Sequence, residues 1–199
     1  MDAKVALCAD PEAGLTLRKV LNSDLSLIAE WLKDRELVRL AFGVTQLSES
    51  EHRSTCEYYM RMVASPHPNF KMLIIGDQGL EPLGIVKYDQ RIIPGVGKVA
   101  FAGIMLGRLE ACGRGLGSRA LLLLERYLFE EAHFDLIELE TADYNLAAQR
   151  SFHKCGFRDR ESLYSLQGIE NYGLGPLDAP KIYMALSKEE YRERQEGQA

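Results

Sequence analysis

Residues 98–118 read KVAFAGIMLGRLEACGRGLGS, and the fold follows from this stretch. Its first part, residues 98–106, is short and rich in β-forming side chains, which predicts a strand. Residues 107–117 then form a glycine-rich loop, after which Leu and Ala recur at helical spacing to about Ala132. Glycines let a ligand approach the backbone, and the first N–H groups of a helix bind anions. The stretch therefore predicts a strand, an anion-binding loop at residues 112–118 and a long helix.

Shorter elements surround this unit. Alternating apolar side chains predict strands, and capping residues at Ser23–Asp24 and Ser48 predict two helices before the meander. In chain order we expect a strand at 15–20, helices from 24 to about 39 and from 48 to about 64, and strands at 71–75, 83–88 and 98–106. After the long helix we expect a strand at 136–141, a helix at 146–155, and strands at about 157–164 and 181–186.

The order of these elements indicates the fold class. Short turns join the strands from 71 to 106, so these strands form an antiparallel meander. A whole helix separates the strands at 98–106 and 136–141, so those two can pair in parallel through a crossover. We therefore predict the α/β class, with a mixed α+β sheet that is mostly antiparallel and has flanking helices. The expected organisation is a loose leader at 1–14, one domain at 15–187 and a polar C-terminal tail at 188–199.

The composition is that of an ordinary globular protein. Of 199 residues, 46% are hydrophobic and 27% are charged, which excludes disordered, collagen-like and coiled-coil classes. The net charge of −5 argues against a nucleic-acid partner. No apolar run reaches the roughly 18 residues of a membrane span, and the N-terminus does not resemble a signal peptide. Four scattered cysteines without CxxC spacing indicate reduced thiols and no metal site, so a cytoplasmic protein is expected.

Several kinds of loop compete for the segment CGRGLGS (112–118). A P-loop requires a Lys directly after its last glycine, and none follows Gly117. A dinucleotide-binding turn requires G-x-G-x-x-G in a doubly wound sheet, whereas the glycines here are Gly113, Gly115 and Gly117. An acidic residue within 135–140 could still serve as the ribose-binding acid of such a site. A glycine-rich turn that only packs tightly is a further alternative.

A further kind of phosphate-binding loop is supported by two separate segments of the sequence. RGLGSRALLLL (114–124) resembles the pyrophosphate loop of the GNAT acetyltransferase superfamily, usually [Q/R]-x-x-G-x-G-[A/G]. The pattern from Asn145 to Phe157 resembles that family's second signature, N-x-x-A-x-x-x-[Y/F]-x-K-x-G-F, at the family's spacing of one helix and one strand. The likeness covers roughly residues 15–186. Residues 30–39 resemble the branch that contains ribosomal-protein N-terminal acetyltransferases and amino-sugar N-acetyltransferases.

The resemblance implies a GNAT-like fold in which two parallel strands splay apart and acetyl-CoA lies between them. The backbone at 104–106 would bind the pantetheine arm, and the N–H groups of 114–118 would hold the pyrophosphate. Asn145 would contact the pantetheine or the substrate, and Lys154 would meet the phosphates. The implied cofactor-binding residues are Ile104, Met105, Leu106, Cys112, Gly113, Arg114, Gly115, Leu116, Gly117, Ser118, Asn145, Phe152 and Lys154.

Two positions depart from the family pattern. Cys112 stands where Gln or Arg is usual, so one polar contact is lost. Phe152 stands where many members carry a Tyr that protonates the departing thiolate. Tyr144 and Tyr127 are candidate substitutes, and water is another proton source because a thiol of pKa about 8.5 is a tolerable leaving group. A covalent route through Cys112 would differ from the direct transfer that the family uses.

The reaction also needs a base, because an acceptor amine of pKa about 10 arrives protonated. Glu140 lies five residues before Asn145 and matches a Glu that some ribosomal-protein acetyltransferases use as the base. The two-residue period of a strand puts Glu138 on the same face. The alternative is that both carboxylates are solvated on an exposed face. Further titratable candidates are His133, His153 and Asp143.

These observations predict an acetyl-CoA-dependent N-acetyltransferase with Glu140 and Tyr144 as catalytic candidates. The acceptor would be a primary amine: a protein N-terminus, an aminoglycoside, a polyamine or an amino sugar. In the family, acceptor pockets come from segments that correspond here to 24–64 and 168–180, and the acidic residues of the first favour a cationic acceptor. A catalytically degenerate acyl-CoA-binding module and a dinucleotide-dependent oxidoreductase are the alternatives, and homodimerisation is left open.

Overall fold

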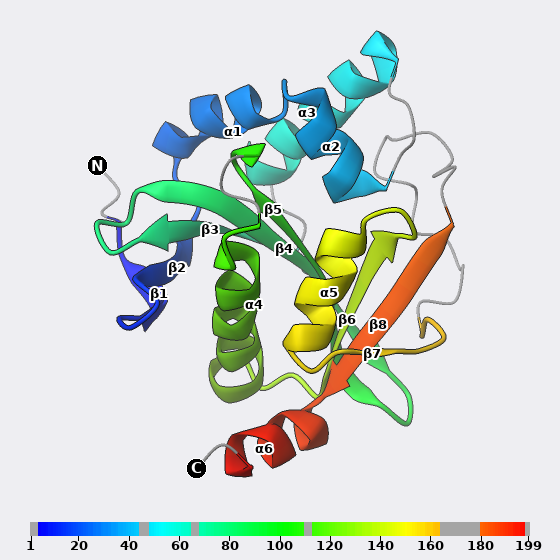
Figure 1. Cartoon of the computed structure of the whole chain (residues 1–199). Coiled ribbons are helices and arrows are strands. Elements are labelled where there is room, and N and C mark those ends of the chain that lie inside the picture. The colour runs from blue at the N-terminus through cyan, green and yellow to red at the C-terminus, as the bar shows by residue number, and fades with distance from the viewer. Residues whose placement is uncertain (1–3, 44–47, 65–67, 110–112, 164–179, 198–199) are drawn as a thin grey trace.

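The computed structural model describes residues 4–43, 48–64, 68–109, 113–163 and 180–197. Its centre is an eight-stranded sheet in the order β1-β2-β3-β4-β5-β6-β8-β7 (Figure 1). Neighbouring strands are antiparallel except for the parallel pair β5 and β6. The strands are β1 (Ala6–Asp10), β2 (Leu15–Lys19), β3 (Phe70–Asp77), β4 (Pro82–Ile93), β5 (Gly97–Leu106), β6 (Leu136–Ala142), β7 (Arg158–Asp159) and β8 (Lys181–Ser187).

Helices cover both faces of this sheet. They are α1 (Leu25–Trp31), α2 (Arg35–Phe42), α3 (Glu49–Ala64), α4 (Leu116–Arg126), α5 (Leu146–Lys154) and α6 (Lys188–Glu196), with a 3-10 turn η1 (Asn22–Asp24) and a π-helical turn η3 (Tyr127–Glu131). On one face, Leu124 of α4 and Phe152 of α5 share a core with Ala102 of β5. On the other, Trp31 of α1 packs with Met105 of β5. The predicted mixed, mostly antiparallel sheet with one parallel pair is confirmed.

The two chain ends differ from their predictions. The expected loose leader contains β1, which pairs with β2 and buries Cys8. The expected polar tail contains α6, which begins at a capping box between Ser187 and Glu190 and buries Tyr191. A five-residue strand and a helix with one apolar residue carry almost no periodic signal, so only their docking on the sheet and on η3 fixes them.

Two internal elements also differ. The helix predicted from 24 to 39 is two helices, because the Asp34 carboxylate accepts hydrogen bonds from the N–H groups of Glu36 and Leu37, at 2.9 and 3.1 Å, and so begins α2. The strand predicted at about 157–164 is, within the described residues, the two-residue β7. Residues 158–161 are all charged and exposed, so they have no apolar face to bury.

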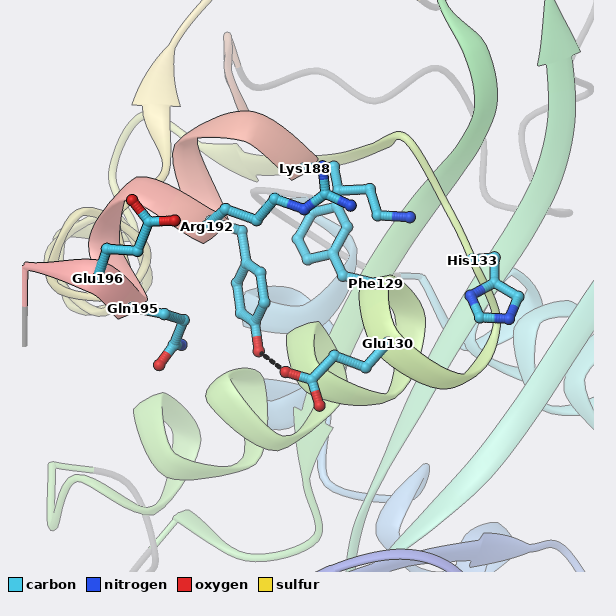
Figure 2. A pocket seen from close by; sticks show the side chains of 8 residues that line it. Phe129, Glu130, His133, Lys188, Arg192, Gln195 and Glu196 are labelled. Carbon is cyan, nitrogen blue, oxygen red and sulfur yellow. Dashed lines mark hydrogen bonds between the residues drawn. The ribbon is translucent and has the colours of Figure 1, made fainter. Parts of the chain in front are cut away.

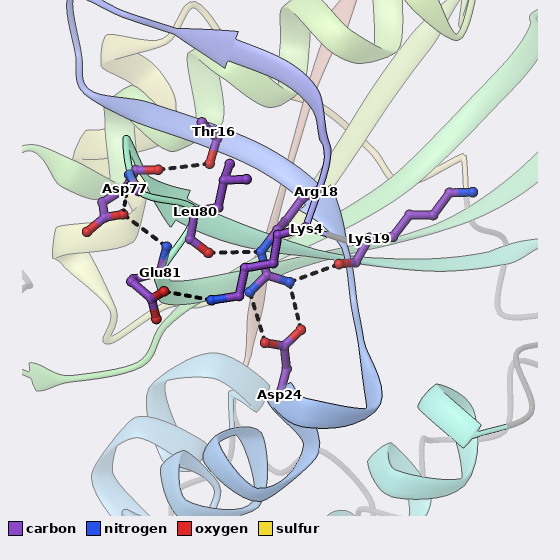
Figure 3. Close-up of polar contacts among 9 residues, drawn as sticks. Lys4, Thr16, Arg18, Lys19, Asp24, Asp77, Leu80 and Glu81 are labelled. Carbon is purple, nitrogen blue, oxygen red and sulfur yellow. Dashed lines mark hydrogen bonds and ion pairs between the residues drawn. The ribbon is translucent and has the colours of Figure 1, made fainter. Parts of the chain in front are cut away.

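A buried ion pair fixes how the chain leaves the sheet for α1 (Figure 3). The guanidinium of Arg18, on β2, donates to both oxygens of Asp24 at 2.7 and 2.9 Å, and neither side chain is more than 4% exposed. Arg18 also donates to the carbonyl of Leu80, in the turn between β3 and β4. Burial raises the pKa of Asp24, but hydrogen bonds from Arg18 and the Leu21 N–H, with the Arg18 charge, hold it below its usual value. The pair joins β2, the β3–β4 turn and η1.

Candidate active site

The parallel strands β5 and β6 stay paired over only part of their length. Their register runs from Val99 opposite Leu136 to Ala102 opposite Leu139. Beyond that point β5 continues to Leu106 and β6 to Ala142, each bonded to its outer neighbour, β4 or β8. In the described residues, the facing edges of 103–106 and 140–142 therefore form no ladder with each other. Backbone groups on such an edge can bind an extended ligand as an added strand.

The glycine-rich loop begins the helix that follows β5. Gly113 and Gly115 have φ angles of +75° and +77°, and Gly115 caps α4 without a side-chain hydrogen bond. The first intrahelical donor is the N–H of Arg119, which bonds the Gly115 carbonyl at 3.1 Å, so the N–H groups of 116–118 precede the helical ladder. A Cβ added at Gly113, Gly115 or Gly117 would meet no atom within 4 Å. The loop thus offers donors and open space for a phosphate group.

The other residues predicted for cofactor binding take different positions around this opening. Ile104 and Leu106 pack against the α4–α5 core, whereas Met105 is buried on the α1 side. Arg114 is exposed, Leu116 is half-buried and Ser118 is buried. The Ser118 carbonyl accepts from the Cys155 thiol at 3.4 Å, so the end of α5 contacts the first turn of α4. Cys112 lies outside the described residues.

Asn145 and Tyr144 both contact the last turn of α2. Asn145 caps α5, accepting from the Ala148 N–H at 3.2 Å, and its amide donates to the Leu40 carbonyl at 3.3 Å. The Tyr144 hydroxyl donates to the Arg39 carbonyl at 3.1 Å, and the Arg39 guanidinium lies 4.5 Å from the centre of its ring. These contacts hold α2 over the end of β6, and they occupy the side chains that we expected to meet pantetheine or to donate a proton.

Phe152 and Lys154, on α5, have opposite environments. Phe152 is 6% exposed, with its ring centre 6.3 Å from that of Phe157. Lys154 is exposed in the last turn of the helix. Since Phe152 has no titratable group and is part of the core, any proton donor must come from another element.

The carboxylates of β6 have separate roles. Glu138 is 4% exposed; its carboxylate accepts from the Ser162 hydroxyl and, at 3.0 Å, from the Leu163 N–H. Glu140 lies where β6 has left β5, with its side chain 47% exposed and an oxygen 2.6 Å from the Lys181 ammonium of β8. The alternative of two solvated carboxylates is therefore wrong for Glu138, and of the two carboxylates Glu140 lies at the opening.

Two lysines at this opening escaped sequence reasoning. Lys181 pairs with Glu140, and Lys87 on β4 lies opposite Gly103 of β5 in the register. Burial lowers the pKa of Lys87 to about 8; the negative charge of Glu140 raises it and the positive charge of Lys181 lowers it. The sequence signal was a lone charge within the apolar strand LGIVKY (83–88).

A separate pocket of about 450 Å³ lies beside the C-terminal helix (Figure 2). Its lining comes from the far end of the α4–η3 helix and from α6, where the Tyr191 hydroxyl donates to Glu130 at 2.6 Å. Because the glycine-rich loop is at the opposite end of α4, this pocket is not part of the opening between β5 and β6. Within the described ranges, no group of three or more His, Cys, Asp or Glu side chains could hold a metal ion, and no helix could cross a membrane.

A parallel strand pair that opens beside a glycine-rich helix N-terminus is the arrangement that the resemblance to the GNAT acyltransferases implies. Residues 14–158 match the family model described as the acetyltransferase (GNAT) domain. The chain therefore belongs to the GNAT acetyltransferase family, whose acyl donor is acetyl-CoA. The predicted acyltransferase class and cosubstrate are confirmed.

Individual relatives agree with this family. The chain is 23% identical, over 94% of its length and 90% of the relative's, to an aminoglycoside N(6')-acetyltransferase type 1 of Klebsiella pneumoniae. Spermidine N-acetyltransferase of Vibrio cholerae, solved with CoA and spermine, matches at a TM-score of 0.66, 20% identity and 90% and 99% coverage of the two chains. Aminoglycoside acetyltransferase AAC(6')-Ib with coenzyme A matches at 0.67, 20% identity and 91% and 99% coverage. These structures share the fold.

Proposed function

We propose that the protein transfers an acetyl group directly from acetyl-CoA to a primary amine of a small, cationic acceptor. The observation that carries this proposal is the opening between β5 and β6 beside the uncapped first turn of α4. The donors at 116–118 suit the pyrophosphate, and the free edge of 103–106 suits the pantetheine arm. The same edge can donate an N–H to the oxyanion of the tetrahedral intermediate.

Glu140 is the proposed base. A partly exposed carboxylate at the opening can take the proton of an incoming ammonium and release it to water. Aminoglycosides and spermine are named for the relatives, and both are polyamines, which favours an acceptor of this kind over a protein N-terminus or an amino sugar. We further propose that residues 15–187, together with β1 and α6 that pack on them, form a single acyltransferase domain. We also propose that the enzyme is cytoplasmic and a homodimer, and the mass of the protein in solution tests the dimer.

A second candidate is an acyl-CoA-binding module without catalysis, which the buried Phe152 motivates. Two measurements separate the candidates. The first compares the melting temperature with acetyl-CoA, CoA, NADH and ATP, where a ligand at about 100 times its Kd adds about 2.7 kcal/mol and raises Tm by about 5–10 °C. The second follows release of the CoA thiol with spermidine, an aminoglycoside and a peptide amine.

A thermal shift with acetyl-CoA and CoA, together with thiol release that depends on an amine, is the expected result. Binding without any amine-dependent release across the panel would favour the module. A shift with NADH or ATP alone would contradict the site assignment.

A further inference from the structure

The Lys87 side chain crosses β5 to reach the opening. Lys87 and Gly103 are partners in the β4–β5 register, so both face the same side of the sheet. A Cβ added at Gly103 would lie 3.0 Å from Cε of Lys87 and 3.6 Å from its Cγ, so the aliphatic stem lies directly over this glycine. Its ammonium interacts electrostatically with Glu140 of β6 and Lys181 of β8, the two strands beyond β5. Gly103 is the first residue of β5 past the last pair with β6.

The departing sulfur takes up a proton, which either water or a side chain at this place can supply. As the tetrahedral intermediate collapses, the C–S bond breaks and the sulfur of coenzyme A takes the electron pair. Phe152 cannot donate a proton, and the Tyr144 hydroxyl donates to the Arg39 carbonyl on α2. Lys181 bonds Glu140 at 2.6 Å. Lys87 and Phe152 lie on opposite faces of the sheet. Lys87 shares the face of Gly103. Phe152 packs in the same core as Ala102, the preceding residue of β5, whose side chain points to the other face.

We propose that the Lys87 ammonium is the catalytic acid that protonates the sulfur of coenzyme A as it leaves. This inference rests on the proposed function. The proton balance closes without another reactant. Glu140 takes one proton from the acceptor ammonium and passes it to water, and the neutral amine attacks the thioester carbonyl. The new C–N bond forms, the C–S bond breaks, and a Lys87 N–H proton goes to sulfur. The proton lost by the acetylated nitrogen returns to the neutral Lys87 through Glu140.

The electrostatics of the surroundings suit this role. Burial brings the pKa of Lys87 to about 8, close to the value of about 8.5 for an ordinary thiol, so the ammonium is a matched donor. Two charged groups act on the Lys87 ammonium, Glu140 of β6 and Lys181 of β8. Other titratable side chains on β6, β8 and α2 include Glu138, Tyr183 and Arg39, the last paired with Glu36. Glu140 favours the ammonium form, whereas Lys181 opposes it.

The test compares Lys87→Met and Lys87→Arg with the wild type in amine acetylation, measuring kcat against pH and KM for acetyl-CoA. Lys87→Met keeps an unbranched apolar stem but has no proton to give. Lys87→Arg keeps the positive charge, but its guanidinium does not release a proton in proteins. Lys71→Met is the matched control, because Lys71 is an exposed lysine on β3, the next strand out.

We expect both variants to lose about 100-fold or more in kcat, as removal of a general acid does, with KM for acetyl-CoA little changed. Wild-type kcat should fall above about pH 8 as the Lys87 ammonium loses its proton, and this fall should be absent in Lys87→Met. A CoA-induced thermal shift in each variant establishes that it folds and binds. If Lys87→Met fails to fold, Lys87→Arg alone decides.

Wild-type kcat in either variant would overturn the assignment. Full activity in Lys87→Arg with loss in Lys87→Met would also overturn it, because positive charge alone would then suffice. If the wild type binds acetyl-CoA but acetylates no amine, the proposed function has failed instead, so the two failures are distinguishable.

Discussion

Gly117 determines whether the first turn of α4 can accept a phosphate. It has no neighbour within 4 Å of an added Cβ, so a Val side chain fits the unliganded fold but fills the space in front of the open N–H groups. We expect Gly117→Val to abolish the rise in Tm that acetyl-CoA causes, with little change in the Tm of the unliganded protein. Differential scanning fluorimetry measures both quantities.

The matched control is Leu122→Val, which places the same β-branched side chain at an exposed position of the same helix. It should bind acetyl-CoA as the wild type does. Undiminished acetyl-CoA binding by Gly117→Val would remove the loop from the site.

Glu140 should matter most when the acceptor amine is protonated. Glu140→Gln removes the carboxylate that takes the ammonium proton, so kcat at neutral pH should fall by about 100-fold or more. The ratio of wild-type to variant kcat should narrow as pH rises toward the amine pKa of about 10, where free amine is abundant. Steady-state kinetics from pH 6 to 10 provide this ratio.

Glu81→Gln is the control, because Glu81 is an exposed carboxylate 2.6 Å from Lys4, the same kind of ion pair away from the opening. A constant ratio across the pH range would show that Glu140 is not the base.

At the scale of the elements, α6 is held by an acidic group that resists ionisation. Arg194 of α6 donates to Glu125 of α4 and to the carbonyl of Cys155 at the end of α5. Glu125 is 0% exposed, and among the described residues its Oε1 has no hydrogen-bond partner. Burial raises the pKa of Glu125 to about 7, although the hydrogen bond and charge of Arg194 lower it.

This pKa predicts that the free energy of unfolding falls as the pH rises toward neutrality. The folded state holds the Glu125 proton that the unfolded state releases above its own pKa of 4.5, so the free energy of unfolding should fall between pH 4.5 and about 7. The shift corresponds to a contribution of about 3 kcal/mol. Glu125→Gln keeps an acceptor for Arg194 and should make this part of the pH dependence vanish in urea titrations. The control is Glu193→Gln, because Glu193 is exposed on α6, and this variant should keep the wild-type dependence of unfolding free energy on pH. If the free energy of unfolding of Glu125→Gln changed with pH in parallel with the wild type, this account would be contradicted.

At the scale of the whole molecule, α1 and the sheet are joined where β5 ends. A Cβ added at Gly107 would lie 2.2 Å from the ring of Trp31, which is 5% exposed on α1. Gly107→Ala must therefore push this helix layer away from the sheet. We expect a cost of about 1–3 kcal/mol, which lowers Tm by roughly 2–12 °C in a chain of this size.

Gly79→Ala is the control for the loss of a glycine. Its added Cβ would approach only the Asp77 carboxylate, at 3.3 Å, in an exposed turn. A Gly107→Ala variant as stable as Gly79→Ala would mean that the α1 layer is not held by this contact.

Local patterns carried much of the fold. The period-2 and helical patterns predicted the meander and the strand–loop–helix unit, and the glycines at 113, 115 and 117 predicted an open helix N-terminus. The same reasoning missed β1, because five residues such as ALCAD are too short to show a pattern. It also fused α1 and α2, because it did not recognise Asp34 as a cap.

By itself, the sequence determined the features that depend on residues close together along the chain. These are the helix caps, the periodicity of the strands and helices, and the glycines that leave room for a phosphate. Only the tertiary structure decided where β5 and β6 separate, which carboxylate remains at the opening, and that Lys87 reaches it over Gly103. These depend on strand order and register between segments tens of residues apart. The sheet brings their charges into one partly desolvated space, where Lys87 acquires its lowered pKa, and no local pattern encodes that proximity.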